Sequence, residues 1–184
     1  MRRMGGKAGL AFGLALLLYA SLPQAGTYAL ATVSVSTSVN ANCQVTTSTL
    51  NFGAYDPIGA QATNNLDVGT NQISIACVQG SAPTIAFNLG LNASGSTRRM
   101  KNTSATDYLN YELYQPSANT SPPPAACNFS GALVVWGSSG ANLFTPAAPP
   151  SKASRSFNIC ARVPSAQDPS VGTYNDTVTA TVNF

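Results

Sequence analysis

Apolar and polar residues alternate with a period of two along most of the chain. The final segment, Thr173–Phe184, shows this alternation most regularly. Its apolar face carries Tyr174, Val178, Ala180, Val182 and Phe184. Such alternation is typical of a β-strand with one buried and one exposed face. Because the edges of a strand need neighbours or protection, the pattern raises the question of what pairs with this segment.

The segment Thr32–Val45 alternates in the same way and contains no charged residue. Its apolar positions are Val33, Val35, Val39, Cys43 and Val45. An N-terminal tail without a partner is normally polar and poorly ordered. The valine pattern therefore predicts a strand that binds along a sheet edge or in a groove.

Six further apolar runs are expected to form strands: Thr49–Gly53, Asn71–Val78, Pro83–Leu91, Tyr108–Tyr114, Ala132–Gly137 and Ser156–Val163. Their expected inward residues are Leu50, Phe52, Ile73, Ile75, Cys77, Ile85, Phe87, Leu89, Leu91, Leu109, Tyr111, Leu113, Phe157, Ile159, Ala161 and Val163, with Glu112 facing outward. Glycine, proline, asparagine and serine separate the runs, and no helical period occurs. The sequence predicts a single all-β sandwich domain.

The N-terminus has the pattern of a secretory signal peptide. Arg2, Arg3 and Lys7 precede a short apolar run, Ala8–Leu22, and small residues follow it. Cleavage is expected after Ala25 or after Ala31, so residues 1–31 are assigned to the signal. No later run is long and apolar enough to predict a membrane span in the mature chain.

Removal of the signal changes the net charge of the chain. The full sequence carries nine basic and six acidic residues, and the signal contains three of the basic ones. The mature chain is therefore expected to be neutral. A neutral chain gives no indication of electrostatic binding to nucleic acid or anionic lipid. Low charge together with many small polar residues favours a protein that packs against copies or partners.

The four cysteines, Cys43, Cys77, Cys127 and Cys160, are expected to form two disulfides in an exported protein. Three pairings are possible from the sequence, and sequential pairing is preferred. Cys43 and Cys77 share the apolar parity of their strands, which favours a buried bond between two core strands. Cys160 has the outward parity, so Cys127–Cys160 is expected to be a surface or loop bond.

The sequence lacks the residue pattern of an enzyme or a metalloprotein. It contains no histidine and no CxxC pair, and the six acids are scattered mostly through turns. We therefore predict no catalytic residues, cofactor or metal site. The basic cluster Arg98-Arg99-x-Lys101 is interpreted as a solvated loop, with a ligand contact as the alternative. Trp136 is interpreted as a packing residue, with a sugar-binding surface as the alternative.

Apolar and polar residues alternate both in the N-terminal segment and in the C-terminal segment, and pairing the two segments across molecules would give each of them a partner. If the sandwich lacks its closing strand, an apolar groove lies beside Thr173–Phe184, and the N-terminal segment of another subunit fills it. This is strand addition to a sheet edge, and a head-to-tail contact that does not close produces a filament. The alternative is that Val33 and Val35 belong to an ordinary first strand of their own domain.

The same residues resemble the spore coat protein U domain family, which includes subunits of archaic chaperone–usher pili. The resemblance is carried by "ANCQV", "TLNFGAYDP", "ISIACVQG", "RRMKNTSATDYLNYELY" and "VGTYNDTVTATVNF". It implies an incomplete immunoglobulin-like β-sandwich, comprising residues 41–184, that lacks its final strand and is completed by donor-strand exchange. It also implies export, capture by a periplasmic chaperone, passage through an outer-membrane usher, and a surface fimbrium that supports attachment and biofilm formation.

On this resemblance, residues 32–40 are the donor segment, with Val33, Val35 and Val39 as donor residues. Thr37 stands where another apolar donor residue is expected. The acceptor strand, where the chaperone also binds, contains Tyr174, Val178, Ala180, Val182 and Phe184. For Tyr174 a structural tyrosine corner is the favoured interpretation. Two other functions stay open: a self-contained secreted sandwich that binds a surface or sugar, and a coat protein that needs no usher.

Overall fold

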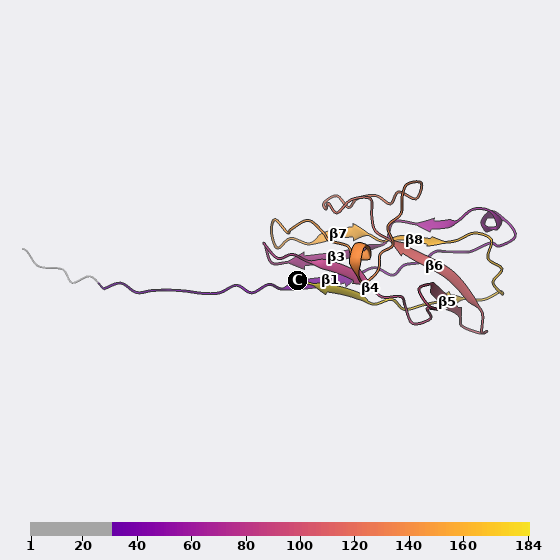
Figure 1. Cartoon of the computed structure of the whole chain (residues 1–184), viewed down its shortest axis with the longest axis horizontal. Helices are drawn as coiled ribbons and strands as arrows, with labels where there is room; N and C mark the ends of the chain where they lie inside the picture. Colours follow the sequence, from indigo (N-terminus) through magenta and orange to yellow (C-terminus); the bar gives the residue numbers. More distant parts are fainter. Residues whose placement is uncertain (1–30) are drawn as a thin grey trace, which may run out of the picture. The chain divides into compact units, whose positions relative to one another are not determined.

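The computed structural model describes residues 31–184. The predicted signal peptide therefore lies outside the described residues, apart from Ala31. The chain divides after Thr37, and Ser38–Phe184 forms one compact unit, to which the description below refers. No strand is assigned to residues 31–42. Of the strand expected over Thr32–Val45, only the part from Cys43 onward is formed (Figure 1).

The described residues contain ten strands and two single 3₁₀ turns, and every strand pairing is antiparallel. The strands are β1 Cys43–Thr47, β2 Leu66–Val68, β3 Gln72–Cys77, β4 Thr84–Phe87, β5 Arg98–Asn102, β6 Tyr108–Tyr114, β7 Arg155–Asn158, β8 Cys160–Val163, β9 Tyr174–Asn175 and β10 Ala180–Asn183. The 3₁₀ turns are η1 Ala60–Ala62 and η2 Gly140–Asn142. The all-β prediction is confirmed.

The strands form three sheets around one core. Their orders are β1-β3-β7, β10-β4 and β2-β8-β6-β5-β9. Strands β7 and β8 are separated only by Ile159, so this stretch of chain passes from the first sheet to the third. Strands β1 and β10 each have one paired and one unpaired edge among the described residues.

The core follows the predicted parity of the central strands. Ile73, Ile75, Phe157 and Val163 are completely buried. A continuous series of ring contacts, Phe87–Trp136–Phe144–Phe157, connects β4 to β7 with centroid separations of 4.7, 4.8 and 5.2 Å. Trp136 has no exposed surface and donates its indole N–H to the carbonyl of Ile85 (2.9 Å). The interpretation of Trp136 as a packing residue is confirmed.

Several expected strands are shorter than the sequence pattern indicates. Thr49–Gly53 carries no strand, and Ala132–Gly137 contributes only an isolated bridge between Val135 and Tyr114. The prediction that Leu89 and Leu91 point inward is wrong, since both are exposed. Strand β4 ends at Phe87, and Gly90 turns the chain with φ +86°. The apolar alternation continues past this turn, but the strand does not, although the backbone N–H groups of Asn88 and Leu91 still donate to the terminal segment.

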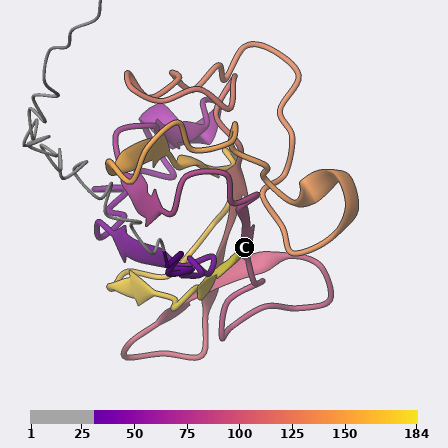
Figure 2. The same cartoon turned by 90° about the vertical axis from the view of Figure 1, so that its left-hand side faces the viewer.

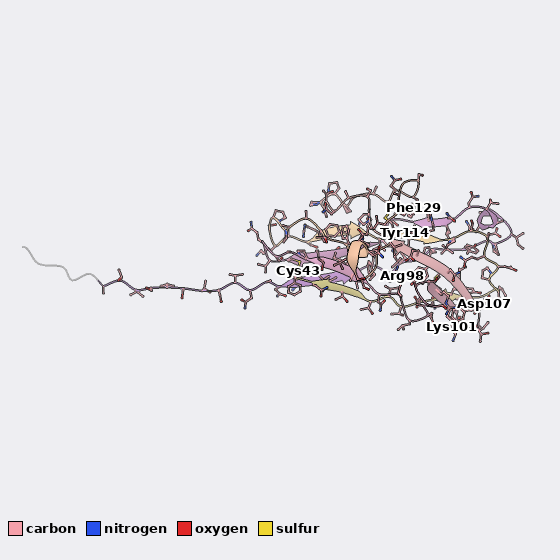
Figure 3. The ribbon with its side chains drawn as sticks, viewed as in Figure 1. Cys43, Arg98, Lys101, Asp107, Tyr114 and Phe129 are labelled. Atoms are coloured by element: carbon pink, nitrogen blue, oxygen red, sulfur yellow. A yellow bond between two sulfur atoms is a disulfide. The ribbon has the colours of Figure 1, made fainter. Side chains whose placement is uncertain are left out.

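The interpretation of the Arg98 cluster as a solvated loop is also wrong. Arg98 begins β5, forms an ion pair with Glu112, and is completely buried near the middle of the domain, whereas Lys101 is exposed (Figure 3). Nη2 of Arg98 donates to the carbonyls of Asn88 and Trp136, both at 2.8 Å. A buried guanidinium is tolerated because its donors and its charge are matched.

Two disulfides join the cysteine pairs that the sequence favours. Cys43 and Cys77 are directly opposed on β1 and β3, with their Cα atoms 4.1 Å apart. Cys127 lies in a loop and bonds to Cys160 of β8. Of the expected surface or loop bond, the loop interpretation is therefore confirmed, whereas the surface interpretation is wrong because Cys160 is completely buried. The parity of Cys160 in its strand predicts exposure, but the loop that carries Cys127 lies against it through the disulfide and buries it.

Candidate functional site

Among the described residues, a hollow lies between the unpaired edge of β1 and the terminal segment. It has a volume of about 680 Å³ and is bordered by Val45–Leu50 on one side and Tyr174–Val178 and Ala180 on the other. Figures 1 and 2 show β1 in indigo and the terminal segment in yellow near each other in both views. We call this hollow the terminal groove.

The floor of the terminal groove consists of core side chains. Phe87, Tyr111, Leu113 and Ile159 line it, and each is at most slightly exposed. Met100 adds a partly buried side chain. An apolar floor beside two unpaired strand edges provides what an additional β-strand needs: backbone partners at its sides and a surface that buries its apolar face.

A second hollow extends the terminal groove toward the loops. It has a volume of about 740 Å³ and shares Thr49, Leu50, Phe52, Met100, Tyr174 and Asn175 with the first. Leu50 and Phe52 therefore line the groove even though their segment forms no strand. Thr49–Gly53 forms no strand because, among the described residues, no backbone–backbone hydrogen bond pairs this segment with a neighbour.

The predicted acceptor residues are placed along the groove to different extents. Tyr174, Val178 and Ala180 line it and are half-buried. Val182 is also half-buried and packs against the core, and it lies opposite Ile85 of β4. Phe184 is 53 % exposed and is not among the lining residues. The terminal strand is also interrupted, because β9 pairs with β5 and β10 with β4.

The predicted donor residues lie in the segment without assigned strand. Val33 and Val35 are exposed by 84 % and 92 %, and Val39 is exposed as well. Val45, which shares their parity, borders the terminal groove and is 44 % exposed. Burial of these side chains would require a further surface.

Tyr174 forms a tyrosine corner. Its hydroxyl donates to the carbonyl of Ser170 (2.7 Å), four residues upstream, and lies 3.0 Å from Asp107 Oδ2. Such a corner is characteristic of immunoglobulin-like sandwiches. Gly172 allows the tight approach, because its φ is +154° and a Cβ there would lie 2.5 Å from Asn102 Nδ2. Tyr174 thus holds the start of the terminal segment while its side chain also borders the groove.

Asp107 is predicted to make the corner sensitive to acid. The backbone N–H of Ser170 lowers the pKa of Asp107 to about 2, helped by the N–H of Tyr108 and the hydroxyls of Ser170 and Tyr174. Because the folded pKa lies below the unfolded one, the stabilisation is full above about pH 4 and is lost as the pH falls toward 2. The melting temperature of the native chain should therefore approach that of Asp107→Asn between pH 5 and pH 2, as measured by circular dichroism.

Asp168→Asn is the matched control for this pH experiment, because Asp168 is an exposed carboxylate of the neighbouring loop. Its melting temperature should differ little from that of the native chain at pH 5. A difference between native and Asp107→Asn chains that stays constant down to pH 2 would contradict the role of Asp107.

A polar pair on the groove was missed from the sequence. Tyr111 donates its hydroxyl to Asp176 Oδ2 (2.7 Å). Oδ1 of Asp176 accepts from the backbone N–H groups of Leu91 (3.0 Å) and Asn92 (3.1 Å). Burial, followed by this hydrogen bond, raises the pKa of Tyr111 well above its usual value. The parity of Asp176 could have revealed it, because it falls on the same face as the apolar residues around it.

Only glycine at position 90 permits this arrangement. A Cβ on Gly90 would lie 1.9 Å from Asp176 Oδ2. The carboxylate thereby fixes the turn after β4 to the terminal segment, and Tyr111 fixes it to β6. Asp176 is the central connection between the groove's wall and its floor.

Together, the tyrosine corner, the two disulfides and the open groove define an immunoglobulin-like β-domain with an apolar groove between two unpaired strand edges. A family model described as the Spore Coat Protein U domain matches residues 29–181, and the chain belongs to this family. Protein U of Myxococcus xanthus is 37 % identical over 145 residues, which cover 74 % of this chain and 72 % of that protein.

A solved structure is also similar. It is the crystal structure of a pre-assembly complex between the chaperone CsuC and the tip adhesion subunit CsuE, from archaic chaperone–usher Csu pili of Acinetobacter baumannii. The match has a TM-score of 0.49 and 21 % identity, and it covers 79 % of this chain but only 40 % of the matched chain. In the described part of this chain, no helix has the length and hydrophobicity needed to cross a membrane.

Proposed function

We propose that the chain is a structural subunit of an archaic-type chaperone–usher pilus, and that the terminal groove accepts a β-strand from another polypeptide. The observation that carries this proposal is the groove itself, with core side chains on its floor and one unpaired strand edge on either side. An apolar surface of this kind is a liability in a free monomer and is covered in an assembly.

The proposed occupant in the filament is the segment 32–40 of a second subunit. Its three valines share one parity and would face one way in a strand, as do the half-buried residues of the terminal segment. Because each subunit gives its segment to one neighbour and receives that of another, the contact is head-to-tail and generates a filament. Before assembly, a periplasmic chaperone would cover the same groove, and an outer-membrane usher would export the subunit.

Family membership supports the proposal, because the spore coat protein U family includes pilus subunits of this type. The expected route is export with a signal of residues 1–31, folding in the periplasm with two disulfides, and display in a surface fimbrium. Attachment and biofilm formation are the proposed roles of that fimbrium. Catalysis is not part of the proposal.

A charge placed in the terminal groove should prevent strand binding. Ala180 lines the groove, so Ala180→Asp would force a carboxylate against the apolar floor, and polymer should fall at least about tenfold since burying an unpaired charge costs several kcal/mol. Thr181→Asp is the matched control, because Thr181 is the next residue, is exposed and faces away. Native gels of mature chain produced with its chaperone measure the ladder of polymers.

The two variants also separate the proposal from a self-contained surface-binding sandwich. In that alternative, the native mature chain is a stable monomer without a chaperone, and neither variant changes its oligomeric state. Equal polymer yields from Ala180→Asp and Thr181→Asp would exclude the terminal groove as the assembly site.

A further inference from the structure

The terminal groove has one polar position on an otherwise apolar face of its wall. Tyr174, Val178 and Ala180 are the other half-buried residues of that wall, and Asp176 interrupts them. Oδ2 of Asp176 accepts one hydrogen bond among the described residues, from the hydroxyl of Tyr111. A carboxylate oxygen and a phenol oxygen can each accept a further hydrogen bond. The pair is therefore an acceptor site within an apolar groove.

The segment 32–39 has a single polar position on its apolar face. Val33, Val35 and Val39 are interrupted only by Thr37. Thr37 carries a hydroxyl that can donate one hydrogen bond. The segment therefore offers one donor among valines, and the groove offers one acceptor site among apolar residues.

We propose that Thr37 of a second copy of this chain lies beside Asp176, donates its hydroxyl to the Asp176–Tyr111 pair, and thereby sets the register of the inserted strand. This inference rests on the proposed function, since it assumes that residues 32–39 enter the terminal groove. It goes further because it specifies which residues face each other.

The arrangement selects an antiparallel strand. With Thr37 opposite Asp176, an antiparallel segment places Val39 opposite Tyr174, Val35 opposite Val178, and Val33 opposite Ala180. A parallel segment with the same anchor would place Val33 opposite Gly172, which lies before the terminal strand begins. Only the antiparallel arrangement seats all three valines along the strand.

The polar match discriminates against slipped registers. A slip of two residues keeps the valines facing the floor, so apolar burial alone distinguishes the registers poorly. The slip does, however, place a valine opposite Asp176, and it leaves the hydroxyl of Thr37 among apolar side chains. A hydrogen bond to a charged group is strong enough to favour the matched register by about tenfold or more.

Disulfide cross-linking between engineered cysteines can determine the register of the inserted strand directly. Residues of even number in the segment face away from the floor, so Ser36 should lie opposite the exposed Thr177. Directly opposed residues have Cα atoms about 4.5–5.5 Å apart, within disulfide range, whereas diagonal ones are about 7–8 Å apart. Full mature chains carrying Ser36→Cys and Thr177→Cys should form intersubunit disulfides, and chains with Ser36→Cys and Thr179→Cys should form about tenfold fewer.

Variants of Thr37 test whether its hydroxyl sets the register of the inserted strand. Thr37→Ser keeps the hydroxyl and should preserve cross-linking between positions 36 and 177, whereas Thr37→Val should lower its yield by about tenfold. The double variant V35T/T37V moves the hydroxyl by two residues. Its cross-link should therefore shift from the 36–177 pair to the 34–177 pair, tested with Ser34→Cys.

Each outcome has a distinct meaning. If the native chain forms no polymers, the proposed function fails. If polymers form but the 36–179 pair cross-links as well as the 36–177 pair, the register is wrong while the proposed function survives. If the 36–177 cross-link persists unchanged in V35T/T37V, Thr37 does not set the register and the inference is overturned.

Discussion

A mature chain that lacks residues 32–39 is expected to fold and to bind its chaperone but to form no polymer. The deletion leaves the core, both disulfides and the terminal groove in place, because the residues that form them begin at Cys43. It removes the three valines whose burial contributes about 4–9 kcal/mol before ordering costs. Native gels and electron microscopy of the chaperone co-expressed chain provide the measurement.

Returning the same segment to the other end of the chain provides the matched control. Residues 32–39, appended after Phe184 through a short glycine–serine linker, can reach the groove as an antiparallel strand of the same molecule. This self-complemented chain should be a soluble monomer that no longer needs the chaperone. Filaments from the deleted chain, or aggregation of the self-complemented chain, would refute the assignment of residues 32–39 as the donor.

The largest expected loss of stability comes from Arg98. Arg98→Ala removes the partner of Glu112 and the donor to the carbonyls of Asn88 and Trp136. Breaking a buried ion pair by removing one partner costs about 3–5 kcal/mol. Urea unfolding of the self-complemented chain should show a loss in this range in the free energy of unfolding.

Arg99→Ala is the control for Arg98→Ala, because Arg99 is adjacent, has the same chemistry and is only partly buried. Its guanidinium stacks on the ring of Tyr108 at 4.1 Å, a contact worth about 0.5–1 kcal/mol at an exposed site. Equal losses for the two variants would show that the buried hydrogen bonds of Arg98 are not the source of the effect.

Sequence reasoning failed at Arg98 for a physical reason. A basic cluster after a glycine–serine turn predicts solvent exposure, since an unpaired buried charge is costly. The cost is offset only when Glu112 and the backbone carbonyls of Phe87, Asn88 and Trp136 converge on the guanidinium from other parts of the fold. Nothing local to the sequence near Arg98 encodes that convergence.

For the terminal groove as well, the sequence identified some features and missed others. The sequence identified the apolar parity of the terminal segment and the unmatched valines near the N-terminus. It did not show that Leu50 and Phe52 border the groove without forming a strand, nor that Asp176 bonds Tyr111 and the turn after β4. Hydrogen bonds between residues distant in sequence, such as the 65 positions between Tyr111 and Asp176, leave no periodic signal.

What the sequence alone determined is the β character of the chain, the inward faces of its central strands and its preferred cysteine pairs; the inward faces follow because side-chain alternation is a direct result of strand geometry. The tertiary structure decided where strands end, which polar groups are buried, and that two strand edges face each other across a groove. Those features depend on which backbone groups find partners, and a partner is a property of the folded chain rather than of any single segment.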